Sequence, residues 1–374
     1  MPVLALISVG LLLLVRPDAA SVPETALLAF LAAFGLTPFV RLLAVRGGAL
    51  DCPDARKTHV HPTPRLGGVA VLAAFVLALG RTSPVDREMI SIAASALALM
   101  LAGALDDTHG LSARVRLILQ FACALFVIAA GVRLNLLPGT AGIVGNTLLS
   151  IVWIVGITNA YNFIDGMDGL AASLGALIAF LLGLVAHGGA QTGLAFACAA
   201  LYGALLGFLP HNLRIGRPAS IFLGDSGSAS VGFLLAALAI KEDWADGDPL
   251  VSLATPVLIF SVLIYDMVQT TVSRIVSGKV RSFRQWIDFV GRDHIHHRFT
   301  VLLGNQRRAL ALILSLALGL GLCALGLHRG DGAEALIFLV HGALVLLVVA
   351  VLEGSAARSS PRSGPAAATG KKRR

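Results

Sequence analysis

Apolar runs recur along the whole chain, and short polar segments separate them. A helix of about 17–25 apolar residues crosses a bilayer, and most of these runs approach that length. The pattern therefore predicts an all-α fold, a polytopic membrane protein of about eleven transmembrane helices. The expected spans are Ala26–Val45, Gly67–Leu79, Met89–Leu105, Val115–Ala130, Ile143–Thr158, Ala171–Ala186, Gly193–Leu209, Ala229–Ile240, Leu250–Val272, Ala309–Leu327 and Ala335–Leu352.

The two ends of the chain differ from this pattern. Val3–Val15 is apolar but short for a span, and it lacks the basic start of a signal peptide. A short first helix and an interfacial helix both remain open for it. Residues 353–374 are rich in Ala, Ser, Pro and Gly and end in four basic residues, which is typical of a disordered tail beside anionic lipid. We therefore expect an N-terminal segment (1–25), a transmembrane domain (26–352) and a basic cytoplasmic tail (353–374).

Composition agrees with a membrane protein and excludes a soluble one. Of the 374 residues, 56% are hydrophobic and 13% are charged, against about 25% charged in soluble domains. The four cysteines are scattered and form neither a disulfide framework nor a metal-binding cluster. The net charge of +8 comes without interleaved aromatic residues or a basic soluble domain, so we expect no nucleic-acid partner.

The basic residues predict the orientation in the membrane. With eleven crossings, the connecting loops alternate between the two faces. One face holds only six of the 29 lysines and arginines, namely Arg16, Arg81, Arg87, Arg133, Lys241 and Arg329. The excess on the other face marks it as cytoplasmic.

All five unusual polar clusters fall on that cytoplasmic face, although only Lys and Arg were used to assign it. They are Asp51–Gly68, Asp106-Asp107 with Arg114 and Arg116, Asn159–Leu170, Phe222–Ser228 and Gly291–Arg298. Because they share one face, we expect them to form a single site.

The stretch Asn159–Leu170 stands between two apolar runs and contains two Asp-Gly pairs. An ionised aspartate at bilayer depth would cost about 2.5–3.5 kcal/mol, so a chain seldom carries one there without a use for it. Glycine after each aspartate breaks the helix, which lets the polar groups gather at a mouth open to water. An ordinary turn between spans is the alternative for this stretch alone.

The residue types in these clusters are those that phosphoryl transfer needs. Carboxylate and carboxamide oxygens suit Mg²⁺, or Mn²⁺ in its place, and the surrounding cations suit anionic substrates. Gly224 and Gly227 flank Asp225-Ser226 and allow a phosphate to approach the backbone. Positioning and charge neutralisation supply most of the catalysis in phosphoryl transfer. A solvated helix end at Asp106-Asp107 and a zinc site or plain basic loop at His294–His297 are the alternatives.

Together the clusters resemble the polyprenyl-phosphate N-acetylhexosamine-1-phosphate transferase superfamily over about residues 26–352. The motifs are D-x-P-x-x-R-K-x-H at Asp51–His59, the pair Asp106-Asp107, N-x-x-N-x-x-D-G-x-D-G-L at Asn159–Leu170, F-x-G-D-x-G-S at Phe222–Ser228 and H-I-H-H at His294–His297. The Pro64–Gly68 and Asp293–His297 segments look like the branch that transfers N-acetylglucosamine 1-phosphate to undecaprenyl phosphate. Ser282–Phe289 departs from the family because it lacks a proline that many relatives show there.

The resemblance implies that a UDP-sugar and undecaprenyl phosphate give undecaprenyl-diphospho-sugar and UMP, with Mg²⁺ as cofactor, at the cytoplasmic face of a bacterial inner membrane. In that family Asp225, joined by Asn162, would bind the metal, Phe222 would stack on the uracil and Asp168 would contact the uridine. The expected catalytic residues are Asp106, Asp107, Asp165, His294, His296 and His297. The expected substrate-binding residues are Lys57, Arg65, Arg116, Asn159, Asp168, Phe222 and Arg292.

Several alternatives stay open. The Asp pair is consistent with direct attack by the lipid phosphate and with a covalent aspartyl-phosphate route. Another UDP-N-acetylhexosamine, or transfer of phospho-N-acetylmuramoyl-pentapeptide, would use similar groups. The oligomeric state is open too, with a homodimer among the choices. A divalent-cation or phosphate transporter is the rival from another class, but transporters usually place their carboxylates near the bilayer midplane and often contain repeats.

Overall fold

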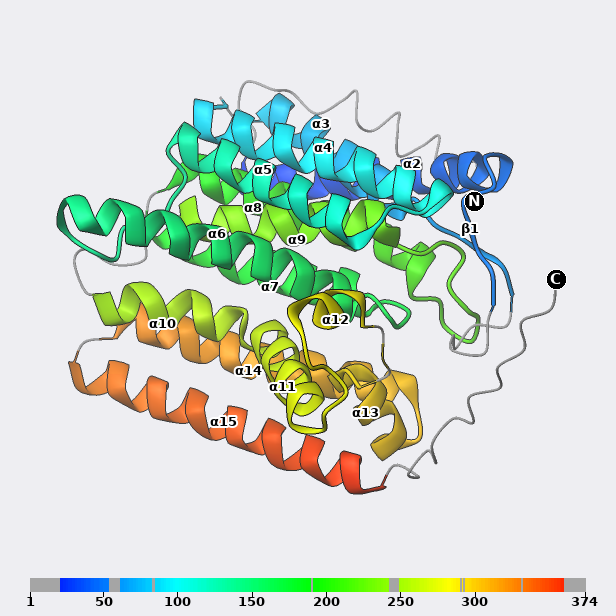
Figure 1. The fold of residues 1–374 in the computed structure, drawn as a ribbon. Helices are drawn as coiled ribbons and strands as arrows, with labels where there is room; N and C mark the ends of the chain where they lie inside the picture. The colour runs from blue at the N-terminus through cyan, green and yellow to red at the C-terminus, as the bar shows by residue number, and fades with distance from the viewer. Residues whose placement is uncertain are drawn as a thin grey trace.

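The computed structural model describes residues 21–53, 61–82, 85–189, 191–241, 249–289, 291, 293–330 and 332–359. Helices dominate this part of the chain (Figure 1). The long and apolar helices are α2 (Val22–Arg46), α3 (Gly67–Thr82), α4 (Arg87–His109), α5 (Ala113–Ala130), α6 (Gly139–Ile164), α7 (Leu170–Gly188), α8 (Thr192–Asn212), α9 (Gly224–Lys241), α10 (Pro249–Ile259), α11 (Ser261–Val276), α14 (Gln306–Arg329) and α15 (Gly332–Ser359). The short elements are strands β1 (Leu50–Asp51) and β2 (Thr63–Pro64), which pair antiparallel, and helices α12 (Phe283–Asp288) and α13 (Ile295–Leu303).

The polytopic all-helical fold is confirmed, with one helix for each expected span except Leu250–Val272. Among the described residues, eight helices are long and apolar enough to cross a membrane, and the bent pair α10–α11 makes a ninth. The two other expected spans are the shorter apolar helix α3 and helix α9, which begins with the polar residues Gly-Asp-Ser-Gly-Ser. We treat the chain as a multi-pass membrane protein.

Helix α9 is surrounded by five other helices, α3, α4, α6, α7 and α8. Nearly all of its side chains are buried. Glycines let its first turn approach its neighbours, because a Cβ on Gly68 would lie 2.1 Å from the Gly227 Cα atom and one on Gly103 would lie 2.4 Å from the Asp225 carbonyl oxygen. Small residues at such contacts are the usual means of close helix packing in membranes. The packing therefore fixes the position of Asp225.

The expected span Leu250–Val272 is broken. Helices α10 and α11 meet at an angle of 79°, directly after a proline in the last turn of α10, Pro256. The break itself lies at Phe260, which donates its N–H to the Pro256 carbonyl oxygen and is the N-cap of α11, whereas a proline disturbs the turn that precedes it. The break turns α11 toward the polar end of the bundle, where α12, α13 and the β1–β2 pair also lie (Figure 1).

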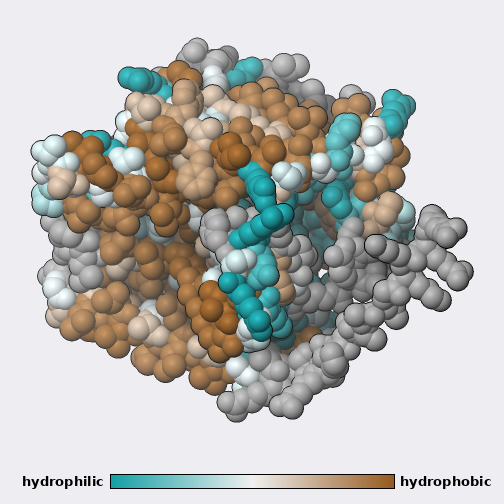
Figure 2. Space-filling model, viewed as in Figure 1, coloured by the Kyte–Doolittle hydropathy of each residue, from teal (hydrophilic) through white to brown (hydrophobic). Residues whose placement is uncertain are grey.

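Helix α15 extends to Ser359, seven residues beyond the expected end of the last span at Leu352. The expected disordered tail began at Glu353, so its first seven residues are helical instead. Residues 360–374 and Val3–Val15 lie outside the described residues, so the expectations for the rest of the tail and for the N-terminal segment stay predictions. Apolar side chains cover most of the surface in the left half of Figure 2, and hydrophilic ones gather at its centre and right. This division fits a bundle that faces lipid along its sides and water at one end.

Candidate active site

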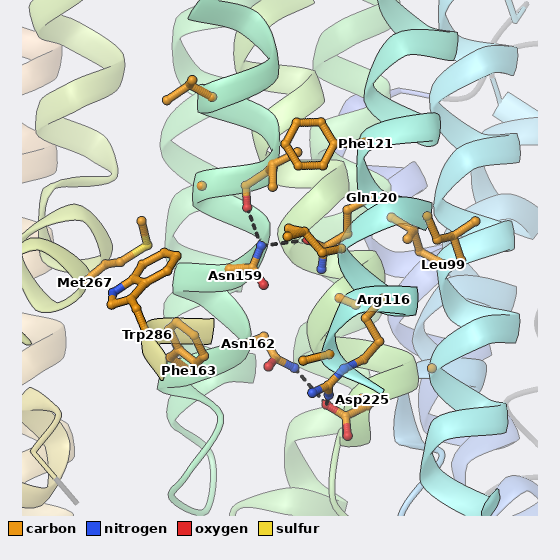
Figure 3. A pocket seen from close by; sticks show the side chains of 18 of the residues that line it. Leu99, Arg116, Gln120, Phe121, Asn159, Asn162, Phe163, Asp225, Met267 and Trp286 are labelled. Carbon is orange, nitrogen blue, oxygen red and sulfur yellow. Dashed lines mark hydrogen bonds and ion pairs between the residues drawn. The ribbon is translucent and has the colours of Figure 1, made fainter. Parts of the chain in front are cut away.

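Asn162 and Asp225 meet where the end of α6 lies beside the start of α9 (Figure 3). The Asn162 amide nitrogen donates to Asp225 Oδ1 at 2.9 Å and to Ser228 Oγ at 2.6 Å. Asp225 stands in the first turn of α9, where the helix dipole favours negative charge. The structure thus brings together the two residues that were expected to bind a metal.

Asp106 and Asp107 are adjacent in sequence but serve different neighbours. Asp106 accepts the Leu111 amide at 2.5 Å and Arg116 Nη1 at 2.9 Å. Asp107 has a fully buried side chain and accepts the backbone N–H groups of Asp225 and Ser226, each at 3.1 Å. Successive residues on a helix point about 100° apart, which sends the two carboxylates to different partners.

Two arginines connect the carboxylates. Arg116 Nη1 lies 2.9 Å from Asp106 and 3.7 Å from Asp225, so this side chain bridges α4 and α9. Arg65 pairs with Asp51 of β1, and its Nη1 lies 3.8 Å from Asp107 Oδ1. Arg65 therefore links strand β1 to Asp107 of α4 through two electrostatic contacts.

One cavity of about 280 Å³, which we call the central cavity, contains several of the expected site residues. Its polar end includes Arg116, Asn159, Asn162, Asp225 and His294. Most of its remaining lining is apolar and comes from α4, α5, α6 and α11, as Figure 3 shows for Leu99, Phe121 and Met267. The polar exceptions are Gln120, Thr270, Thr271 and Arg274. A cavity of this kind can hold a molecule with an anionic head and an apolar tail.

Asn159 lies at the junction of the polar and apolar parts of the central cavity. Its amide nitrogen donates to Gln120 Oε1 and to the Val155 carbonyl oxygen, both at 2.7 Å (Figure 3). Gln120 was not among the expected site residues. Its position one turn after Arg116 in α5 was the signal that could have found it.

His294 begins α13 and is held by two residues of α11. Its Nδ1 lies 2.8 Å from Asp266 Oδ2, and Arg274 Nη2 lies 3.3 Å from its Nε2. An arginine can only donate, so Nε2 is the acceptor and Nδ1–H donates to Asp266. This pair of contacts orients the ring toward the central cavity.

Asp266 and Arg274 are buried residues that the sequence analysis missed. Asp266 also accepts the Ile295 backbone N–H at 2.6 Å, and Arg274 forms a bidentate pair with Asp293 at 2.6 and 2.9 Å. Asp266 lies inside an expected membrane span, and an ionisable residue in such a place is by default a candidate for function. That signal was present in the sequence.

His296 and His297 follow on α13, with ring centroids 4.1 Å apart. His296 is 2% exposed, and neither of its ring nitrogens has a hydrogen-bond partner within the described part of the chain. Burial, with His297 and His294 nearby, lowers the pKa of His296 well below its usual value, so its ring is neutral. Its Nε2 faces Gly166 so closely that a Cβ there would lie 2.4 Å away.

Asp165 ends α6 in the loop that precedes α7. Burial, followed by the negative charges of Asp225, Asp107 and Asp168, raises the pKa of Asp165 to about 7, and the Gly224 N–H opposes this shift. Asp165 therefore holds a proton below about pH 7 unless a cation offsets the surrounding charge.

Asp168 and Phe222 lie outside the central cavity. Asp168 Oδ2 accepts the Ala219 N–H at 2.9 Å and lines a second pocket of about 410 Å³ with Arg214, Arg217 and Arg307. Phe222 is half-buried, and its backbone bonds to Pro64 and Gly67. The structure therefore separates these two expected uridine contacts from the central cavity. Lys57 and Arg292 lie outside the described residues.

The carboxylate and carboxamide oxygens at this site suit Mg²⁺ better than a metal that needs three or more protein ligands. Within the described ranges, no group of three His, Cys, Asp or Glu side chains forms a metal site. Magnesium, however, is usually held by one or two carboxylates together with substrate phosphates and water. Asp225 opens into the central cavity, and the carboxylate crowding that raises the pKa of Asp165 is charge that a divalent cation would offset.

Comparison with known proteins agrees with this site. The profile of "Glycosyl transferase family 4" matches residues 89–242. The chain is 32% identical over 290 residues to "Probable undecaprenyl-phosphate N-acetylglucosaminyl 1-phosphate transferase" of Bacillus subtilis, covering 75% of this chain and 77% of the relative. It is 33% identical over 322 residues to "Decaprenyl-phosphate N-acetylglucosaminephosphotransferase" of Mycolicibacterium smegmatis, covering 78% and 77%. It is 29% identical over 286 residues to "Undecaprenyl-phosphate alpha-N-acetylglucosaminyl 1-phosphate transferase" of Escherichia coli K12, covering 74% and 75%.

The fold and the site together define a multi-pass membrane transferase. The chain belongs to glycosyl transferase family 4, the polyprenyl-phosphate N-acetylhexosamine-1-phosphate transferases. The family expected from the motifs is confirmed, and the reaction class is polyprenyl-phosphate N-acetylhexosamine-1-phosphate transfer.

Proposed function

We propose that this protein transfers N-acetylglucosamine 1-phosphate from UDP-N-acetylglucosamine to undecaprenyl phosphate and releases UMP. The observation that carries the proposal is the central cavity, whose apolar lining leads to Arg116, Asn162 and Asp225. An isoprenoid phosphate has the same division into an apolar chain and an anionic head. The names of the relatives supply the sugar, since each names N-acetylglucosamine.

In the proposed reaction, an oxygen of the lipid phosphate attacks the sugar-linked phosphorus of the UDP-sugar. A new P–O bond forms as the bond to the UMP oxygen breaks, so UMP leaves with that electron pair. The second pKa of a phosphate monoester is about 6, so the lipid phosphate is mostly a dianion at pH 7 and needs little help from a general base.

The main task of the side chains is then to bring two anions together. Arg116 already contacts Asp106 and Asp225 and lies at the polar end of the central cavity, where its remaining N–H groups suit phosphate oxygens. Asp106 holds Arg116 in place, and we assign it to the lipid phosphate side of the site. His294 is oriented by Asp266 and lies at the same end.

We propose Mg²⁺ as the cofactor, with Asp225 and Asn162 as its protein ligands and Mn²⁺ as a substitute. When bound there, the ion would neutralise the diphosphate charge. Asn162 would present its carboxamide oxygen to the ion, whereas its amide nitrogen faces Asp225 in the structure (Figure 3).

Assays of purified protein with a panel of UDP-sugars test the proposed donor. We expect UDP-N-acetylglucosamine to be used at least about tenfold more efficiently than its galactose epimer or UDP-N-acetylmuramoyl-pentapeptide, a difference of ~1.4 kcal/mol in the transition state. A preference for either of the others would transfer the proposal to that donor.

We also propose that the site opens to the cytoplasm of a bacterial inner membrane, because 23 of the 29 basic residues fall on that face in the predicted topology. A cysteine placed at Ser282, the N-cap of α12, is therefore expected to resist an impermeant thiol reagent in intact cells and to react after lysis. Rapid labelling in intact cells would reverse the topology.

Phe222 is the proposed platform for the uracil ring. Stacking on an aromatic face is worth about 1–3 kcal/mol per nucleic acid base. Phe222→Ala is expected to raise the KM for UDP-N-acetylglucosamine by about tenfold or more without a matching change in the KM for the lipid. An unchanged KM for the nucleotide would remove Phe222 from the uridine site.

A further inference from the structure

The last membrane helix, α15, is mostly turned toward lipid, but its polar end is anchored inside the protein. Leu347 and Val351 are 59% and 61% exposed, as expected for a helix on the outside of the bundle. Glu353, in the next turn, is only 2% exposed. A buried carboxylate is costly unless it is paired, so its partners are informative.

Glu353 has two partners on two other helices. Arg298 Nη1 of α13 lies 2.6 Å from Glu353 Oε1, and the Tyr265 hydroxyl of α11 donates to Glu353 Oε2 at 2.5 Å. Both carboxylate oxygens are thus used. The contact ties the end of α15 to the helix that carries the histidine motif.

Helix α13 is consequently held from two sides. At its first turn, Asp266 accepts the Ile295 N–H and bonds to His294. One turn later, Glu353 holds Arg298, and Tyr265, the neighbour of Asp266 in α11, completes that contact. His296 and His297 lie between these two attachments.

The orientation of α13 matters because His296 packs against the loop after α6. His296 Nε2 faces Gly166, the residue that follows Asp165, with no room for a side chain between them. A small rotation of α13 would therefore displace the histidines relative to Asp165 and to the central cavity. Misplacement of a catalytic group by about 1 Å can reduce turnover by about a hundredfold.

We propose that Glu353 is a positioning residue for the transferase reaction, acting through Arg298 to hold the His296–His297 turn of α13 against the Asp165–Gly166 loop. The last membrane helix is then a working part of the active site. This inference rests on the proposed function, because its test measures N-acetylglucosamine-1-phosphate transfer.

The test compares four variants of the full-length protein: Glu353→Gln, Arg298→Met, the double variant, and Glu334→Gln, which removes an exposed carboxylate from the first turn of the same helix. We expect each of the first two to lower kcat per mole of monodisperse enzyme by about tenfold, with the KM for UDP-N-acetylglucosamine within about twofold of the parent. Glu334→Gln should match the parent. The double variant should lose about tenfold as well, because the two side chains act as one unit.

A merely structural salt bridge gives other results. If Glu353→Gln lowered only the melting temperature or the yield, with kcat unchanged, the proposal would be overturned. The proposal would also be overturned if the double variant regained parental kcat. The loss in each single variant would then come from the unpaired buried charge that it leaves. If Glu353→Gln yields no monodisperse protein, the double variant decides. A parent enzyme that makes no lipid product would instead contradict the proposed function itself.

Discussion

Replacing Asp225 with asparagine is expected to lower turnover by about a hundredfold or more. Asparagine keeps the shape and one oxygen, so the contact with the Asn162 amide nitrogen can survive at one atom. What is lost is the negative charge that a hard cation requires, at the point where α9 opens into the central cavity. The affinity for Mn²⁺ should therefore fall together with turnover, and electron paramagnetic resonance during a Mn²⁺ titration with UDP-N-acetylglucosamine present measures it.

Asp86→Asn is the matched control. Asp86 caps the opposite end of α4 from Asp106-Asp107, and asparagine is an equally good cap. This variant should bind Mn²⁺ and turn over like the parent. Parental Mn²⁺ affinity in Asp225→Asn, or an equal loss in the control, would contradict the assignment of Asp225 to the metal.

Replacing Asp106 and Asp107 one at a time with asparagine is expected to give two different losses of function. We infer that Asp107 positions the metal site, because it binds the N–H groups of Asp225 and Ser226 and adds its charge to the N-terminus of α9. In Asp107→Asn, an amide NH₂ group replaces one of the two carboxylate oxygens, so it faces the N–H group of Asp225 or Ser226 without an acceptor between them. This substitution should cost about 1–3 kcal/mol of stability and weaken Mn²⁺ binding.

Asp106→Asn should behave differently. It weakens the hold on Arg116 while leaving the start of α9 intact, so turnover should fall about tenfold to a hundredfold with Mn²⁺ binding near the parent value. Thermal unfolding in detergent, paired with the same Mn²⁺ titration, compares the two variants. If Asp106→Asn lost Mn²⁺ and Asp107→Asn kept it, the roles would be reversed.

The positions of the helices were predictable because apolar length alone determines which segments suit a bilayer. The break between α10 and α11 was not predictable, because the apolar run Leu250–Val272 continues across Phe260 without a change in composition. The end of α15 was placed too early at Leu352. The apolar run ends at Leu352, but the helix continues to Ser359, and Glu353 within this extension is buried and pairs with Arg298.

Part of the clustering was also predictable, since Asp, Asn and His clusters on one face imply a shared centre, but Asp168 and Phe222 lie outside the central cavity. The structure brings Arg116, Asn159, Asn162, Asp225 and His294 to one cavity. Individual contacts were not predictable. Asp106-Asp107 reads as one pair, and only the packing of α4 on α9 sends the two carboxylates to different partners. Asp266 was visible as a carboxylate inside an apolar run, but its contacts with His294 and Ile295 of α13 were not predictable.

The most direct measurement of the central claim follows the phosphorus atoms. Purified protein with undecaprenyl phosphate, Mg²⁺ and UDP-N-acetylglucosamine labelled with ³²P at the sugar-linked phosphate should place the label in a chloroform-soluble diphospholipid. UMP should appear in equal amount. Label that stays in UDP, with only the sugar moving to lipid, would contradict sugar-1-phosphate transfer, as would the absence of any labelled lipid.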